Sequence, residues 1–384
     1  MRVAFDARWY NDSGVGTHVA GLLRAMAAAD RDFELVVYEH ANNPIPALDG
    51  LSIIRVPVRS PKYSSSGQNE LRRRAREDRL DLFHSPFYPA PFVLPCPVVV
   101  TIHDLIPFRF QLYPWPKQWM VKTGYRTAVR RARHIIAVSQ HTADDIKSML
   151  GVTPERVTVI HNAVAADCFH RETRRGELEY LRERYGVHPP YALAASARNW
   201  RTKNLESALQ ALEIARSQGV AKFQPVVYGP GEGLDALNAE QRWPLLNLRR
   251  TGYVAAADLA ALFRHAQVFV MPSLYEGFGL PVLEAMSCGC AVVTSNAGSL
   301  PEIAGKGARM FEPFDVAGMA GAIARLLCNP EELHRSRVSA LVRAADFSWD
   351  KAARETISVY HRLQSQSSVD GTGDTQKRIQ RSMA

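Results

Sequence analysis

The chain has 384 residues, of which 46% are hydrophobic, and a formal net charge of +9 at pH 7. This length exceeds what one hydrophobic core usually serves, so the sequence predicts two globular domains. No apolar run reaches the roughly 18 residues that a transmembrane helix needs. The N-terminus also lacks the apolar core of a signal peptide, so we predict a cytoplasmic protein.

The positive charge leaves several classes of partner open. Phosphorylated substrates, anionic lipid and nucleic acid all suit a basic protein, and an ordinary solvated surface would account for most of these charges. No aromatic-and-basic RNA motif or helix-turn-helix pattern is present, so no nucleic-acid partner is predicted. The five cysteines lack zinc-site spacing and are predicted to be structural, including the close pair Cys288 and Cys290.

The first part of the chain, 1–170, alternates strands and helices. The predicted strands are 2–7, 33–38, 51–58, 82–86, 97–102, 134–138 and 157–160. The predicted helices are 17–28, 70–79, 115–133 and 142–150, and a mobile loop is predicted over 59–68. Strands that alternate with helices indicate a parallel, doubly wound sheet.

A polar stretch without a strand pattern, 171–188, is predicted to link this domain to a second one over 189–346. The second domain has the same alternation, with predicted strands at 192–195, 223–228, 248–251, 268–271, 291–294 and 308–311. Its predicted helices are 204–218, 257–265, 280–287 and 316–327. A C-terminal helix over 347–363 and a disordered, polar tail over 364–384 complete the chain. The predicted fold class is α/β, with two doubly wound, Rossmann-like domains that face each other across a cleft and bind ligands at the strand ends.

One stretch of the second domain combines a strand, a glycine loop and a helix. Strand 268–271 leads into Glu276, Gly277 and Gly279, and the helix from 280 carries Glu284 in its first turn. Glycines allow a ligand to approach the backbone closely, and N–H groups at a helix start are free to bind oxygen atoms. Two carboxylates beside such donors predict a sugar or nucleotide site.

The spacing of Glu276 and Glu284, with seven residues between them, resembles the signature of retaining nucleotide-sugar glycosyltransferases of family four, which have the GT-B fold. Flanking segments agree with this family, namely 154–160, 197–204, 269–273, 299–302 and 347–349. The resemblance extends from Met1 to about Leu363. It departs from the family at Ala163, where glycine is frequent, and around residues 14–16, where a longer glycine run is usual.

This resemblance implies transfer of a sugar from a nucleoside diphosphate to an acceptor hydroxyl, with retention of the anomeric configuration. Negative charge then grows on the departing diphosphate, and the resemblance implies that Arg198 and Lys203 stabilise it. The alternative for these two is a solvated basic turn. Glu284 is implied to accept hydrogen bonds from the ribose hydroxyls, although a carboxylate in a first helical turn is also favourable by itself. Glu276 is implied to contact the donor sugar.

The strand 97–102 ends at His103, which the resemblance implies as a second contact to the donor sugar, with Asp104 as a neighbour that orients it. The implied catalytic residues are His103, Arg198, Lys203 and Glu276. The implied donor-binding residues are Gly14, Gly16, Arg198, Lys203, Gly277, Phe278, Gly279, Leu280 and Glu284. Three further strand ends, Ser139, His161 and Asn162, are secondary candidates.

No metal or cofactor is expected, because the family's same-face mechanism needs none and no Asp-x-Asp motif is present. The expected donor is GDP-mannose, followed by UDP-sugars, and the expected acceptor is a glycan or a lipid-linked glycan of a cell-surface polysaccharide or glycolipid. The alternatives are a nucleotide-sugar epimerase or phosphorylase of the same fold, and a noncatalytic protein that binds sugar nucleotides or nucleic acid.

Helix 115–133 carries six Lys and Arg residues among Trp, Met, Val and Tyr. This pattern is typical of a helix that contacts anionic lipid headgroups, and equally of an ordinary helix with a solvated face. A peripheral position on the cytoplasmic membrane face is therefore one expectation for the protein.

Overall fold

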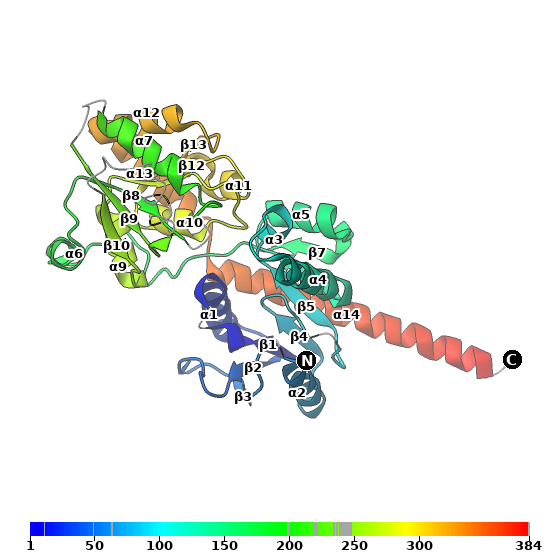
Figure 1. Cartoon of the computed structure of the whole chain (residues 1–384). Coiled ribbons are helices and arrows are strands. Elements are labelled where there is room, and N and C mark those ends of the chain that lie inside the picture. The colour runs from blue at the N-terminus through cyan, green and yellow to red at the C-terminus, as the bar shows by residue number, and fades with distance from the viewer. Residues whose placement is uncertain are drawn as a thin grey trace.

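The computed structural model describes the chain except for residues 11, 49, 63, 92, 198–199, 218–221, 233–234, 236, 238–247 and 383–384, with only the backbone described at 13 and 367–382. The described residues form two α/β domains and a long C-terminal helix that returns to the first domain (Figure 1). The two predicted doubly wound sheets are confirmed, and both are parallel throughout their described pairings.

The N-terminal domain contains a seven-stranded sheet with the order β3-β2-β1-β4-β5-β6-β7. Its strands are β1 Arg2–Asp6, β2 Glu34–His40, β3 Ile54–Val58, β4 Leu82–Ser85, β5 Val98–Ile102, β6 His134–Ala137 and β7 Val157–Val159. Its α-helices are α1 Ser13–Ala28, α2 Ser65–Glu77, α3 Ile106–Arg109, α4 Trp115–Arg131 and α5 Gln140–Leu150. All residues of β5 are buried, as expected for a central strand covered by helices on both faces.

The C-terminal domain contains a six-stranded sheet with the order β10-β9-β8-β11-β12-β13. Helix α6, Glu177–Tyr185, precedes it, and the strands are β8 Tyr191–Ala195, β9 Gln224–Tyr228, β10 Arg249–Gly252, β11 Val268–Met271, β12 Ala291–Ser295 and β13 Arg309–Phe311. The helices are α7 Leu205–Ser217, α9 Ala256–His265, α10 Leu280–Ser287, α11 Leu300–Ala304, α12 Val316–Cys328 and α13 Pro330–Ala344.

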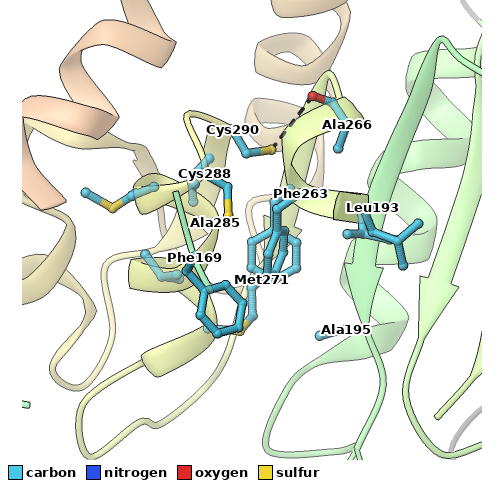
Figure 2. Packing of buried hydrophobic residues seen from close by; sticks show 14 of the residues in the cluster. Phe169, Leu193, Ala195, Phe263, Ala266, Met271, Ala285, Cys288 and Cys290 are labelled. Carbon is cyan, nitrogen blue, oxygen red and sulfur yellow. Dashed lines mark hydrogen bonds between the residues drawn. The ribbon is translucent and has the colours of Figure 1, made fainter. Parts of the chain in front are cut away.

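The core of this domain contains the close cysteine pair. Cys288 and Cys290 lie in one buried cluster with Phe169, Phe263 and Met271 (Figure 2). Burial raises the pKa of the Cys290 thiol to about 12, so the thiol stays protonated. The prediction that these two cysteines are structural is therefore confirmed.

The C-terminal helix α14 spans Trp349–Ser382 and packs against α1 of the first domain (Figure 1). Tyr360 is fully buried, and its hydroxyl lies 2.5 Å from Nδ1 of His84. Helix α14 continues past the predicted end at residue 363 as far as Ser382, and the disorder predicted for the tail stays a prediction. The segment beyond residue 363 projects away from the body of the molecule (Figure 1).

Three local features differ from the sequence prediction. Helix α13 was not predicted, because only Ala340 and Ala344 of its residues are buried and its apolar pattern is weak. Helix α2 begins inside the predicted loop, where the side chain of Ser64 accepts a hydrogen bond from the N–H of Gly67 at 2.9 Å. Helix α1 begins at Ser13, so the glycines predicted to precede it lie in its first turns.

None of the helices in the described part of the chain combines the length and the apolar character that a bilayer crossing requires.

Candidate active site

The two domains meet at the ends of their central strands, through Gly277. A Cβ atom on Gly277 would lie 1.8 Å from the carbonyl oxygen of His103 and 2.8 Å from Cβ of Asp104. The loop after β11 therefore rests directly against the end of β5, with no space for a side chain. The sequence attributed this glycine to the approach of a ligand, whereas the structure gives it a role in domain contact.

The carbonyl group of Gly277 is held by the start of α5. The hydroxyls of Ser139 and Thr142 donate to it at 2.6 and 3.1 Å. Ser139 also caps this helix, since its Oγ accepts the N–H of Thr142 at 3.0 Å. Ser139, a secondary candidate from the sequence, thus positions the loop that contains Glu276.

Glu276 forms a buried ion pair with Lys203. Its Oε1 lies 2.5 Å from Nζ of Lys203, and only 7% of the residue is exposed. The backbone around Glu276 is fixed as well, because Ser299 donates to its carbonyl oxygen from both N–H and hydroxyl, at 3.2 and 3.1 Å. The structure thus brings Lys203 and Glu276 together as predicted residues of one site. Arg198 lies outside the described residues, so its predicted place stays a prediction.

Asp104 faces this ion pair from the other domain. Burial and the charge of Glu276 raise the pKa of Asp104 to about 6, while Lys203 and the N–H of Ile106 act in the opposite direction. Its Oδ1 accepts that N–H at 3.0 Å and makes no described bond to His103. Asp104 therefore adds a third carboxylate to the junction and does not orient the histidine.

His103 is oriented by a backbone carbonyl instead. Its Nε2 lies 2.8 Å from the carbonyl oxygen of Pro86, which can only accept, so Nε2 carries the proton. Burial lowers the pKa of His103 to about 4, and the ring is neutral at pH 7. Nδ1 is then unprotonated and suited to accept a hydrogen bond from a sugar hydroxyl.

His18 is a residue of this region that the sequence did not single out. Its ring lies 4.7 Å from that of His103 in an edge-to-face arrangement, and its Nδ1 is 2.8 Å from Oδ1 of Asn162. Burial and the proximity of His103 lower the pKa of His18 well below its usual value, so it is neutral. The position of His18 one turn after Gly14 in a helix that opens at a strand end was the available signal.

The predicted glycines at the start of α1 differ in their surroundings. A Cβ on Gly16 would lie 2.3 Å from the carbonyl oxygen of Tyr10, whereas a Cβ on Gly14 would meet nothing within 4 Å. Gly16 is therefore required by packing. Gly14 leaves the first turn of α1 open to a ligand.

The start of α10 supplies the predicted backbone donors. Gly279 has φ of +95°, a left-handed conformation that favours glycine, and it gives the helix no side-chain cap. Pro281 has no N–H, and the N–H groups of Val282 and Leu283 donate to the carbonyl oxygen of Gly279 at 3.0 and 3.3 Å. The N–H of Leu280 makes no bond among the described backbone groups, so it is the first-turn donor open to a ligand. The ring of Phe278 points elsewhere and packs edge-to-face on Phe347 at 5.9 Å. Only the backbone of Phe278 fits the predicted donor contact.

Glu284 lies one turn further along α10. Burial raises its pKa to about 7, and Lys203 partly offsets that shift. The buried phenol of Tyr228, at the end of β9, has its pKa raised by burial and by the charges of Glu284 and Glu276. Lys203 therefore acts on both glutamates, and Glu276, Glu284 and Lys203 belong to one electrostatic unit.

A second connection between the domains is made by Glu302 of α11. Its carboxylate accepts the N–H of Gln140 at 2.9 Å, at the start of α5, and lies 2.6 Å from Nε2 of His161. Burial by itself would raise the pKa of Glu302, but the hydrogen bonds from these two partners outweigh it and lower the pKa below its usual value. His161, predicted as a secondary candidate, thus serves the contact between the domains.

Residues 189–329 match the family model described as Glycosyl transferases group 1, and residues 13–167 match the model described as Glycosyltransferase Family 4. The chain belongs to this family of glycosyltransferases. The two matched segments contain every site residue predicted from the sequence.

Relatives of this glycosyltransferase include proteins named for mannosyl transfer. It is 26% identical over 377 residues to the O-antigen chain mannosyltransferase B of Escherichia coli, covering 92% of this chain and 97% of the relative. It is 31% identical over 303 residues to a serotype-specific mannosyltransferase WbdA of the same species, covering 75% of this chain and 36% of WbdA. The chain therefore spans about a third of the length of WbdA.

Among solved structures, the HepE protein of Anabaena in complex with UDP-glucose is similar in fold. The TM-score is 0.71 at 20% identity, over 94% of this chain and 100% of HepE. The predicted GT-B fold of the glycosyltransferase is confirmed.

The raised pKa of Glu284 predicts a stability change with pH in the ligand-free enzyme. Its folded-state pKa of about 7 exceeds its ordinary value of 4.5, so the stability from this group is full below about pH 4.5 and is lost as pH rises through about 7. Glu284→Gln removes this loss. At about pH 8 we expect the variant to be more stable than the wild type by about 2 kcal/mol, less than the full shift implies because the side chain is only partly buried.

Urea unfolding of both proteins between about pH 4.5 and 8 checks this expectation. Parallel stability curves for wild type and variant would contradict it.

Proposed function

We propose that the chain is a retaining mannosyltransferase that moves mannose from GDP-mannose to a hydroxyl of a glycan or lipid-linked acceptor in cell-surface polysaccharide or glycolipid synthesis. The observation that carries the proposal is the junction itself: His103 and Asp104 of one domain face Glu276 and Lys203 of the other. The mannosyl part is supported by the names of the two Escherichia coli relatives.

In this proposal the C-terminal domain holds the donor. Lys203 and the N–H of Leu280 at the start of α10 stabilise the diphosphate as negative charge grows on it. Glu284 accepts hydrogen bonds from the ribose hydroxyls. The diphosphate competes with Glu276 for Lys203, and Glu276 is then available to the hydroxyls of the donor sugar.

The proposed chemistry is a same-face substitution. The bond between the anomeric carbon and the phosphate oxygen breaks, and the acceptor oxygen bonds to the same face of that carbon. The acceptor proton passes to the departing phosphate oxygen. Neutral His103, with its unprotonated Nδ1, holds a donor hydroxyl near the anomeric carbon and takes no proton at neutral pH.

A panel of nucleotide sugars tests the donor and the stereochemistry. We expect GDP-mannose to raise the midpoint of thermal unfolding more than UDP-glucose or UDP-galactose, because a donor that binds the native state stabilises it. Transfer from GDP-α-mannose should give an α-linked product by NMR, at an unchanged rate in EDTA if no metal is required.

A β-linked product would overturn retention, and a larger shift with a UDP-sugar would replace GDP-mannose as the donor. Hydrolysis or transfer of no nucleotide sugar, together with salt-sensitive DNA binding, would instead support the noncatalytic alternative.

We also propose that α4 contacts the cytoplasmic face of an anionic membrane. Its N-terminal half exposes Trp115 by 75%, Trp119 by 60% and Met120 by 61%, an unusual group of large apolar side chains on a surface. Basic residues of the same helix are exposed as well, including Lys117 and Arg126. Aromatic rings and cations together suit the headgroup region of a bilayer.

We expect binding to vesicles that contain anionic phosphatidylglycerol and weaker binding as salt rises, because exposed charges are screened. Trp115→Ala should weaken this binding. Sedimentation with anionic and neutral vesicles measures it, and equal binding to both would contradict the proposed contact.

A further inference from the structure

A cavity of about 640 Å³ lies in the N-terminal domain, between the start of α2, the segment after β4 and the middle of α4. It is distinct from the junction residues described above. Its volume falls in the range of small-molecule sites. Its lining consists of Ser64, Ser65, Gln68, Asn69, Tyr88, Pro89, Trp119, Met120, Val121, Thr123, Gly124 and Thr127.

One wall of the cavity is polar and the other is mainly apolar. The α2 wall carries hydroxyl and amide groups, while the α4 wall and the 88–89 segment carry mainly apolar side chains. No Asp, Glu, Lys or Arg is among the described lining residues. A ligand that matches both walls has an uncharged alkyl part joined to a part with hydroxyl groups.

The aromatic side chains at the base of the apolar wall are tightly packed. Tyr88 stacks on Tyr125 with ring centroids 3.5 Å apart and an interplanar angle of 24°. A Cβ on Gly124 would lie 3.2 Å from Cε2 of Tyr88, so the glycine allows the tyrosine to lie close to the helix. Trp119 and Met120 remain more than half exposed at this wall. Covering them with an alkyl chain removes apolar surface from water.

The cavity is connected to the candidate active site through aromatic rings. The ring of Tyr88 lies 4.8 Å from that of Phe87, and the ring of Phe87 lies 6.1 Å from that of His103. Two side chains, Tyr88 of the cavity lining and Phe87 behind it, thus lie between a molecule in the cavity and His103. The cavity lies in the N-terminal domain, which the proposed function assigns to the acceptor.

We propose that this cavity binds the alkyl chain of a lipid-linked acceptor, with the sugar part directed toward His103. This inference rests on the proposed function, since a transferase is what makes the molecule an acceptor. The proposed membrane contact and the cavity share Trp119 and Met120, but Trp115 belongs to the membrane contact alone, because it is exposed and does not line the cavity.

Binding of an alkyl glycoside series to the full-length chain tests the proposal. The probes are methyl, hexyl and octyl α-mannoside below their micelle concentrations, measured by calorimetry. For the wild type we expect the dissociation constant to fall with chain length, by up to about fourfold for each methylene group that becomes buried.

Two variants and one matched control identify the place of binding. Thr127→Trp fills the cavity, and Trp119→Ala removes apolar wall from an exposed position where folding is not at risk. Both should reduce the dependence on chain length and leave the affinity for methyl mannoside unchanged. Trp115→Ala removes an equally large exposed ring from the same helix outside the cavity and should keep the wild-type dependence.

The proposal would be overturned if the dissociation constant still fell with chain length in both cavity variants as it does in the wild type. It would also be overturned if Trp115→Ala reduced this dependence as much as the cavity variants do. Nucleotide-sugar binding by the same proteins separates this failure from that of the proposed function. Chain-length dependence without any nucleotide-sugar binding would overturn the transferase and the acceptor assignment. Donor binding without chain-length dependence would overturn the cavity inference alone.

Discussion

Lys203→Ala and Glu284→Ala are each expected to lower kcat/KM for the transferase reaction by at least about 100-fold. Removal of one preorganised charge-stabilising donor typically costs this much or more, and Lys203 is the described cation at the junction. Loss of Glu284 removes the proposed acceptor of the ribose hydrogen bonds. Steady-state kinetics with the donor identified by thermal unfolding measure both effects, and full activity in both variants would refute the site assignment.

The Lys203 variant needs a control for stability. Removing the lysine leaves the buried carboxylate of Glu276 without its partner, which by itself destabilises a protein by several kcal/mol. The double variant Lys203→Met, Glu276→Gln has no unpaired charge and should recover stability without recovering activity. Lys306→Ala, which removes an exposed lysine from the same domain, should retain wild-type kinetics.

Gly277→Ala is expected to have an effect of similar size for a different reason. The new methyl group would lie 1.8 Å from the backbone oxygen of His103, and a backbone atom cannot rotate away. The two domains must separate locally, which moves Glu276 and Lys203 away from His103. A displacement of about 1 Å between reacting groups can cost about 100-fold in rate, so we expect at least that loss in kcat.

The circular dichroism spectrum of Gly277→Ala should match that of the wild type, because each domain keeps its own core. Gly321→Ala is the matched control. Gly321 lies inside α12, and a Cβ there would first meet a side-chain nitrogen of Arg325 at 3.6 Å. This substitution should leave kcat unchanged and stabilise the helix by about 0.5–1 kcal/mol. Wild-type kinetics in Gly277→Ala would show that the close contact is not needed for transfer.

The fold could be predicted from the sequence because its strands are short apolar runs between helical patterns. Each of the thirteen strands in the described part of the chain overlaps a predicted strand, with ends that differ by a few residues. Helix α13 has few buried side chains, and the sequence of α14 beyond Leu363 is polar. Both therefore lack the periodicity on which the sequence prediction depends.

Individual residues of the candidate site could be predicted from the sequence, but the contacts between them could not. The sequence placed Glu276 and His103 after strands and Lys203 in a loop that begins a helix, but it contained no information that Glu276 and Lys203 pair with each other. It also did not assign Gly277 to the domain contact, or Glu302 to a bond with His161, since these depend on how two domains come together. Contacts between separate domains leave no periodic signal in either segment.

The central claim is that one site at the domain junction binds the donor, and a crystal structure with intact GDP-mannose tests it most directly. We predict that the diphosphate lies at Lys203 and the start of α10, with the ribose hydroxyls on Glu284 and the mannose between Glu276 and His103. A donor bound elsewhere, or a diphosphate without contact to Lys203 and α10, would contradict the claim.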